Sequence, residues 1–291
     1  MPDNSFEPKI PIAAVTDEFS PSLEEAIPVM KEIGMTAAEL RVINRKNIVD
    51  MNDREIERAK EMLDSAGLRV ISIASPVLKC VLPNGPDLDG RFQHDVFGSN
   101  YNFDDQPRLV ERAIYVAKFF GARILRVFSY WRTVRPEACE QAIASALTEL
   151  AGQAAKENLI IGLENEHACN IATAAESARI LKLVSHPNLK LIWDPGNALA
   201  AGENPFPDGY SLLPKGRIAH VHAKDCHMEA GRPVWGPLGT RHVLWREQIA
   251  ALVADKYEGF LSLETHWSGP GGNKLEASRI CGWNLRGLAA C

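Results

Sequence analysis

Short apolar runs rich in β-branched residues recur along the whole chain, and amphipathic stretches separate them. Such runs between turn signals are typical of buried strands, and their alternation with helical stretches is typical of a parallel sheet built from repeated βα units. The pattern predicts eight strands, at 10–15, 37–42, 69–75, 123–129, 159–165, 189–194, 217–223 and 259–265. A helix is expected after each of them.

The stretch after the second strand shows how these helices are recognised. Its apolar residues recur at helical spacing: Ile56, Ala59, Leu63 and Ala66. Asp53 is the predicted N-cap, and Gly67 is the predicted C-terminal stop. The fourth helix repeats the stripe with Cys139, Ile143, Leu147, Leu150 and Ala154. These stripes are expected to pack on the sheet and to carry no chemistry.

Turns into the strands are brief, whereas long segments follow the strands, so the elaborate loops are expected on one face. In a (β/α)₈ barrel that is the C-terminal face, where active sites are built. The sequence therefore predicts an α/β fold, a single-domain (β/α)₈ TIM barrel over 10–291 after an N-terminal tail at 1–9. The loops 76–103 and 226–241 are each either a lid or a static surface, which could include a subunit contact.

Composition narrows the class of protein. With 46% hydrophobic and 24% charged residues, the chain has the make-up of a soluble globular protein. A net charge of -5, spread along the chain, argues against a nucleic-acid partner. The sequence shows no apolar run of membrane-spanning length and no signal peptide, and the six cysteines form no C-x-x-C pairs. These features predict a cytoplasmic protein with no membrane partner, and they leave a homo-oligomer open.

Four residues able to ligate a metal stand at the ends of the last four predicted strands: Glu164, Asp194, His222 and Glu264. Side chains alternate between the two faces of a strand, so all four can point into one barrel mouth. Three buried carboxylates would repel one another unless a cation binds them. The oxygen-rich set favours one divalent ion, Mn²⁺ or Mg²⁺, with Co²⁺ and Zn²⁺ as alternatives. Taken singly, each could instead be a buried polar residue paired with Lys or Arg.

The motifs around these residues are LEN at 163–165, WDPGN at 193–197, HVHAKD at 220–225 and LSLE at 261–264. With them the chain resembles the xylose isomerase-like TIM barrel family (sugar phosphate isomerase/epimerase-like), which includes sugar isomerases, ketose 3-epimerases, inosose dehydratases and the endonuclease IV group. The resemblance implies Glu, Asp, His and Glu as ligands of one metal. It favours His222 over His220, which is two residues away on the same strand and would be a deeper residue, unless the two exchange roles.

The resemblance also implies a reaction. The metal would hold the carbonyl and a neighbouring hydroxyl of an open-chain sugar and stabilise the enediolate that forms on proton abstraction. Glu164 and Glu264 would be catalytic, as an acid/base pair on opposite faces of the reacting carbon, as well as ligands. Asp194 and His222 would only hold the metal. The implied function is a sugar isomerase or epimerase of carbohydrate metabolism.

Polar residues at or just beyond the strand ends are candidates for substrate binding: Lys224, His167, Asn197, Glu39, Arg126 and His266, with Trp131 and Arg241 nearby. Each has an alternative as a loop or structural residue. Lys224 could be an exposed surface lysine, and Glu39 and Arg126 could pair with each other. The expected partner is a small sugar or keto-polyol.

Two departures from the family keep other functions open. Asn197 stands where ketose 3-epimerases tend to carry histidine, and the second and third strand ends carry no histidine, which argues against the endonuclease branch. A dehydratase or lyase acting on a keto-polyol or keto-sugar derivative, like an inosose dehydratase, would begin with the same proton abstraction. A non-catalytic sugar-binding barrel is a further alternative. The glycine-rich segment 268–273 could cradle a phosphate or could be a flexible loop.

Overall fold

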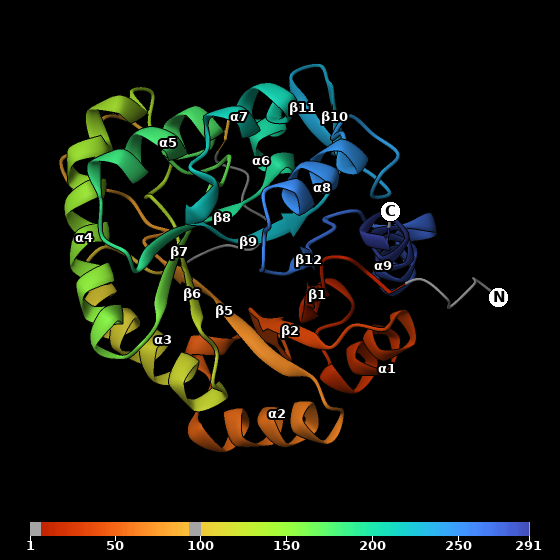
Figure 1. The fold of residues 1–291 in the computed structure, drawn as a ribbon. Coiled ribbons are helices and arrows are strands. Elements are labelled where there is room, and N and C mark those ends of the chain that lie inside the picture. Colours follow the sequence, from red (N-terminus) through yellow and green to blue (C-terminus); the bar gives the residue numbers. More distant parts are fainter. Residues whose placement is uncertain (1–6, 93–99, 291) are drawn as a thin grey trace. The chain divides into compact units, whose positions relative to one another are not determined.

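The computed structural model describes residues 7–92 and 100–290. The chain divides into two compact units. Unit 1 holds the described residues up to Ile71 and those from His220 onward, and unit 2 is Ser72–Ala219. Figure 1 follows the chain from red at the N-terminus to blue at the C-terminus. The first and last segments of the chain therefore belong to the same unit.

The sheet of unit 1 is parallel, with neighbouring strands in the order β2, β1, β12, β9. Its strands are β1 (Ile12–Val15), β2 (Ala37–Leu40), β9 (Ile218–Ala223), which enters the unit at His220, and β12 (Leu261–Leu263). In the register of β12 and β9, Ser262 lies opposite His222. Because parallel strands end at the same edge of a sheet, the residues after these strands gather there.

Four helices accompany this sheet: α1 (Leu23–Ile33), α2 (Asp53–Ser65), α8 (Trp245–Ala254) and α9 (Lys274–Ala290). Two hairpins lie beside it, β3 (Val42–Ile43) with β4 (Lys46–Asn47) and β10 (Cys226–Glu229) with β11 (Arg232–Trp235). Short helical turns are η1 (Thr16–Glu18), η2 (Ile48–Asp50) and η6 (Pro270–Gly272). Figure 1 shows α1 beside α9, so the two ends of the chain pack together.

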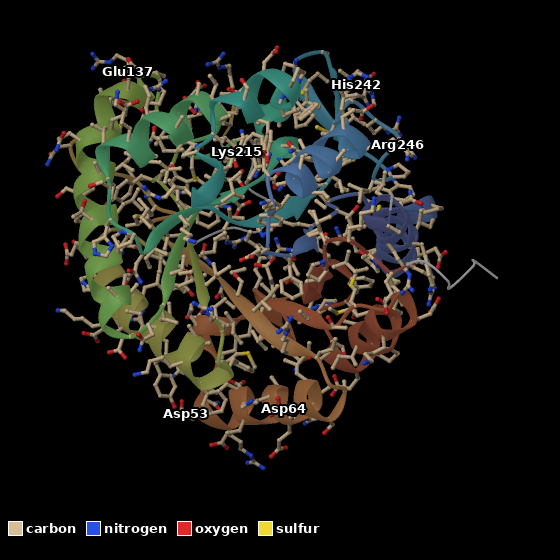
Figure 2. All side chains as sticks on the ribbon, viewed as in Figure 1. Asp53, Asp64, Glu137, Lys215, His242 and Arg246 are labelled. Carbon is tan, nitrogen blue, oxygen red and sulfur yellow. The ribbon has the colours of Figure 1, made fainter. Side chains whose placement is uncertain are left out.

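Helix α2 has the predicted apolar face and a different cap. Ile56, Ala59 and Leu63 are buried, whereas Asp53 and Asp64 project outward in Figure 2. The predicted N-cap, Asp53, is wrong by one residue. The cap is Asn52, whose side chain accepts from the Glu55 N–H while the Glu55 side chain accepts from the Asn52 N–H. This reciprocal capping box satisfies two backbone donors at once, which a cap at Asp53 would not do.

The segment after β9 is a fixed hairpin followed by an anchored loop. The Asp225 carboxylate accepts the backbone N–H groups of Gly239, Arg241 and Val243 at 2.9–3.1 Å. The Asp225 carbonyl accepts the N–H of Gly236 at 3.0 Å. A single buried aspartate thus fastens the part of the predicted 226–241 loop that follows the hairpin, through main-chain donors.

The sheet of unit 2 is also parallel, with β5, β6, β7 and β8 in sequence order. Its strands are β5 (Arg69–Val77), which enters the unit at Ser72, β6 (Ile124–Val127), β7 (Ile160–Glu164) and β8 (Leu189–Trp193). A Cβ at Gly162 of β7 would lie only 2.8 Å from the Ile192 side chain and 2.9 Å from that of Ile124. Glycine at this position lets the neighbouring side chains pack against the strand backbone.

The helices of unit 2 are α3 (Gln106–Phe120), α4 (Glu140–Lys156), α5 (Ala174–Leu183), α6 (Pro195–Ala200) and α7 (Tyr210–Leu212). Its short turns are η3 (Pro136–Cys139), η4 (Pro205–Gly209) and η5 (Lys215–Arg217). Figure 1 shows α3, α4 and α5 along the outer side of these strands. The apolar stripe predicted for the fourth helix, from Cys139 to Ala154, is buried.

Each predicted strand coincides with an observed one to within a few residues. Val42, predicted at the end of the second strand, instead pairs with Asn47 in the β3–β4 hairpin. β5 runs to Val77 through an irregularity in its register with β6, so the predicted 76–103 loop begins later, and its residues 93–99 lie outside the described ones. In the parts of the chain that the structure describes, no helix is long and apolar enough to span a bilayer.

Candidate active site

Glu264, directly after β12, is the centre of the cluster at the strand ends of unit 1. Its side chain is buried and accepts from Arg41 Nη1 at 2.7 Å through Oε1 and from Lys224 Nζ at 2.8 Å through Oε2. Burial raises the pKa of Glu264, but the charges of Lys224 and His222 outweigh it and hold the pKa well below its usual range. Glu264 is therefore a carboxylate at neutral pH.

His222, inside β9, lies between two carboxylates. Its Nε2 is 3.0 Å from Glu39 Oε2, and its Nδ1 is 3.4 Å from Glu264 Oε2. All three side chains are almost completely buried. Glu39 comes from β2, so three strands of the same sheet bring these groups together.

Lys224 is fully buried, with 0% of its surface exposed. The alternative that it is an exposed surface lysine is wrong, because its Nζ pairs with Glu264 and lies 3.2 Å from His266 Nε2. Its carbonyl accepts from the indole N–H of Trp245 at 3.0 Å. Lys224 is thus held at both ends and presents one buried cation to the cluster.

His266 closes the cluster from the loop after β12. Its ring packs on that of Trp235 from the β10–β11 hairpin, with centroids 5.1 Å apart. Burial and the charge of Lys224 lower the pKa of His266. Its backbone has φ +52°, in the left-handed region that non-glycine residues seldom occupy. Its N–H donates to Glu18 Oε2 at 3.2 Å.

Arg41 is a site residue that the sequence reasoning missed. It is buried just after β2 and pairs with three carboxylates, those of Asp17, Glu18 and Glu264, at 2.7–2.9 Å. Burial raises the pKa of Glu18, but the charges of Lys274 and Arg41 outweigh it and lower the pKa to about 2. The available signal was the spacing of Glu39 and Arg41, two charged residues on one face of an otherwise apolar strand.

Two groups of side chains within unit 1 have the composition of a metal site. In each, one ligand atom per residue lies within 4.8 Å of the others: Glu39, His220 and His222 form one group, and Glu18, Glu264 and His266 form the other. The second group is partly shared with the cluster around Glu264. Acidic and imidazole groups that could hold a metal are therefore present at the strand ends of this unit.

In unit 2 the candidate ligands Glu164 and Asp194 are also buried, and amide side chains surround them. Asn165 is bonded to the backbone of Asp194 in both directions: its Oδ1 accepts from the Asp194 N–H and its Nδ2 donates to the Asp194 carbonyl, both at 2.8 Å. Asp194 is also the N-cap of α6, where Oδ1 accepts from the Asn197 N–H at 2.9 Å. The Asn165 side chain and the backbone N–H of Asn197 thus fix Asp194.

Asn197 joins two predicted site residues of unit 2. Its Nδ2 donates to Glu164 Oε1 at 3.2 Å, and its Oδ1 lies 3.0 Å from His167 Nδ1. Arg126 Nη1 is 3.2 Å from Glu164 Oε2. The structure therefore gathers Glu164, Asp194, Asn197, His167 and Arg126 within unit 2. In unit 1 it gathers Glu39, His222, Lys224, Glu264 and His266.

Residues 27–283 match the protein family described as "Xylose isomerase-like TIM barrel". The chain belongs to the xylose isomerase-like TIM barrel family. This family match confirms the predicted fold class, a TIM barrel. No curated protein matches the sequence.

Several solved structures share the fold. The D-allulose 3-epimerase from Methylomonas sp. is 20% identical, with a TM-score of 0.67 and coverage of 98% of this chain and 96% of that one. The probable 3-DHS dehydratase AsbF from Bacillus anthracis is 18% identical, with a TM-score of 0.66 and coverage of 93% and 97%. The IOLI protein, described with a zinc atom, is 15% identical, with a TM-score of 0.73 and coverage of 97% and 98%. At these identities the likeness concerns the fold alone.

Proposed function

We propose that this protein is a divalent-metal-dependent enzyme that removes a proton from the carbon next to the carbonyl of a small sugar, as a sugar isomerase or epimerase does. The observation that carries the proposal is the buried group of Glu264, His222 and Lys224, at the ends of two neighbouring parallel strands. Active sites of (β/α)₈ enzymes are built at the C-terminal ends of the strands.

The proposed metal ligands are His222 and Glu264 from unit 1 and Glu164 and Asp194 from unit 2. Each is buried at a strand end, and three carboxylates with one imidazole form a hard donor set that favours Mn²⁺ or Mg²⁺, with Co²⁺ and Zn²⁺ as alternatives. A carboxylate has about four lone-pair sites, so Glu264 retains acceptor capacity beyond its bonds to Arg41 and Lys224. When bound, a divalent ion supplies a Lewis acid that polarises a carbonyl and acidifies the adjacent C–H bond.

The side chains of this chain supply the proton transfers. Glu264 is ionised at neutral pH and accepts the proton. Lys224 Nζ, beside it at 2.8 Å, donates a hydrogen bond to a substrate oxygen. Glu164 enters the reaction protonated and returns a proton at the opposite face, while Glu264 keeps the one removed; Arg126 and Asn197 contact the two oxygens of Glu164. His167, Asn197 and His266 then provide donors and acceptors for sugar hydroxyls.

A dehydratase or lyase acting on a keto-polyol is the second candidate. The pair formed by Lys224 Nζ and His266 Nε2, 3.2 Å apart, favours it, because this pair could protonate a leaving hydroxyl beside the base Glu264. Both reactions begin with the same proton abstraction. They differ in the product, which is an isomeric sugar in one case and a dehydrated one in the other.

The test is proton NMR in D₂O on Mn²⁺-loaded and Mg²⁺-loaded protein with a panel of ketoses, inososes and 3-keto-glucosides. We expect the signal next to the carbonyl to disappear with the wild type and to persist with Glu264→Gln. Glu176→Gln is the matched control, because Glu176 is a buried carboxylate paired with Arg132 and lies outside the proposed site. The control is expected to bind metal and to catalyse exchange.

Metal content of the same proteins tests the ligand set. Glu164→Gln, from unit 2, and Glu264→Gln, from unit 1, are each expected to lower bound metal. If only the unit 1 substitution lowers it, the ion is held by unit 1 alone and the four-residue set is wrong. If metal and sugar bind but no panel member exchanges a proton, the barrel is a sugar-binding protein and the enzyme proposal fails.

A further inference from the structure

We propose that Glu39 is a positioning residue that keeps the imidazole proton of His222 on Nε2 and thereby turns the Nδ1 lone pair toward Glu264. This inference concerns Glu39 and the tautomer of His222, and only its consequence for metal affinity rests on the proposed function. This positioning role differs from substrate binding, which was the role expected for Glu39 from its place near a strand end.

The contacts of His222 define the direction of the hydrogen bond. Nε2 lies 3.0 Å from Glu39 Oε2, and Ser262 Oγ donates to the same oxygen at 2.6 Å, so Glu39 Oε2 is an acceptor. An ionised carboxylate only accepts hydrogen bonds. Nε2–H of His222 therefore donates, and a neutral ring with its proton on Nε2 has its lone pair on Nδ1.

The Nδ1 side of the ring faces the proposed metal site. Nδ1 lies 3.4 Å from Glu264 Oε2, on the opposite side from Glu39. Metal-ligating histidines generally donate their other ring N–H to a carboxylate or carbonyl, which fixes the tautomer and the ring orientation. The contacts here have the same arrangement: Glu39 lies on one side of the His222 ring, and the proposed metal site lies on the other.

Glu39 is itself fixed from another strand. Ser262 Oγ donates to Glu39 Oε2 at 2.6 Å, and Ser262 is the register partner of His222 across β12 and β9. Both Ser262 and Glu39 have 0% of their surface exposed. Because Glu39 is shielded by its neighbours, it lies behind His222 and acts on the site through that ring.

His220 offers a competing interpretation. Its Nε2 also lies 3.0 Å from Glu39 Oε2, although among the described residues it makes no aligned hydrogen bond. Glu39, His220 and His222 could instead hold an ion of their own. That would need the lone pair of His222 on Nε2, and a neutral imidazole has only one nitrogen with a free lone pair. His222 cannot therefore serve this inner ion and donate to Glu39 as well.

Two-bond ¹H–¹⁵N correlation spectra of ¹⁵N-histidine-labelled, metal-free protein report the tautomer directly. The spectra are recorded at pH 8, and His222→Gln assigns the His222 signals by difference. We expect Nε2–H on His222 in the wild type. A proton on Nδ1, alone or together with Nε2–H, would overturn the proposal.

Glu39→Gln then tests what holds the proton in place. The amide can turn its NH₂ group toward Nε2 and favour the other tautomer, so the Nε2–H population should fall. Mn²⁺ affinity should weaken by about 10–100-fold, the usual effect of removing such a partner. Glu176→Gln is the matched control, since it replaces a buried carboxylate that pairs with Arg132 outside the proposed site. It should leave the His222 tautomer and the Mn²⁺ affinity unchanged.

The outcomes separate this proposal from the function proposed above. Nε2–H on His222 in a protein that binds no metal would keep the tautomer assignment and defeat the metal enzyme. Metal binding by a protein whose His222 carries its proton on Nδ1 would support the metal enzyme and defeat the tautomer assignment. Two equivalents of Mn²⁺ in the wild type, one of them lost in His220→Gln, would establish the inner ion and overturn the role given to Glu39.

Discussion

Two strand-end carboxylates, Glu264 in unit 1 and Asp194 in unit 2, are held in different ways. In unit 1, Glu264 is held by charge, with Arg41 on one oxygen and Lys224 on the other. In unit 2, Asp194 is held by neutral groups, the amide of Asn165 and the backbone N–H of Asn197. A buried charge pair is strong but leaves an uncompensated charge when one partner is lost, whereas a neutral hydrogen bond contributes less and costs less to remove. The attachment of Glu264 should therefore be more sensitive to changes of charge and pH than that of Asp194.

The largest effect is expected from Arg41→Met. The substitution leaves three buried carboxylates, on Asp17, Glu18 and Glu264, without their shared cation. Breaking a buried ion pair typically costs about 3–5 kcal/mol, so the free energy of unfolding in urea should fall by at least that order. Arg41→Lys retains the charge and should lose less. A loss below about 1 kcal/mol for Arg41→Met, the size of an exposed pair, would mean that charge does not hold this cluster.

The next effect is a pH dependence caused by Glu18. Its pKa in the folded chain is about 2, against 4.5 ordinarily, so its contribution to stability is complete above about 4.5 and is lost as the pH falls toward 2. A shift of this size corresponds to a contribution on the order of 3 kcal/mol. We expect Glu18→Gln to flatten the decline of unfolding free energy across this acid range. Glu157→Gln, which removes an exposed pair with Lys118, should reproduce the wild-type profile, and an equal decline in both variants would contradict the assignment.

Asn165→Ala tests the neutral hydrogen bonds that hold Asp194 in unit 2. It removes the side-chain partners of the Asp194 N–H and carbonyl, and a buried group left without its bond costs about 1–3 kcal/mol. The loss should be the same at pH 5 and pH 8, because no charge is involved. A loss that varies strongly with pH would show that the attachment of Asp194 also depends on ionised groups. Urea unfolding at the two pH values measures it.

The smallest effect is expected from the helix caps, which lie away from the candidate site residues of each unit. Each carries a capping box, Asn52 with Glu55 at α2 and Thr173 with Glu176 at α5. Replacing either cap by alanine should cost about 1 kcal/mol. Similar changes in thermal unfolding for Asn52→Ala and Thr173→Ala would locate the difference between the units at the strand ends. A large disparity would mean that the units differ throughout.

Much of the fold could be predicted from the sequence because it depends on local composition. Apolar, β-branched runs predicted every strand of the barrel, and only their ends differ, as where Val42 leaves β2 for a hairpin. The cap of α2 was assigned one residue late, because Asn52 and Asp53 are both good caps and only the reciprocal bond with Glu55 decides between them. The domain boundaries at 1–9 and 10–291 stay predictions.

The site was predictable where it lies in motifs and unpredictable where it depends on distant contacts. His222, Lys224 and Glu264 were all identified, and the structure brings them together. The pairing of Arg41 with Glu264 joins residues 223 positions apart, and no spacing along the chain encodes it. The burial of Lys224 could not be predicted either, because the sequence alone is equally consistent with a lysine at the surface. The metal and the roles of its ligands stay predictions.

The way Asp225 fastens the loop after β9 has a consequence for protein engineering. Its carboxylate and carbonyl bind main-chain N–H groups, which every residue except proline provides. The exposed side chains of Thr240 and Arg241 are therefore open to randomisation in a combinatorial library without loss of this attachment, whereas Leu238 is buried and Gly239 has φ +78°. A barrel whose loop is anchored by its backbone is a scaffold on which new substrate preferences can be selected.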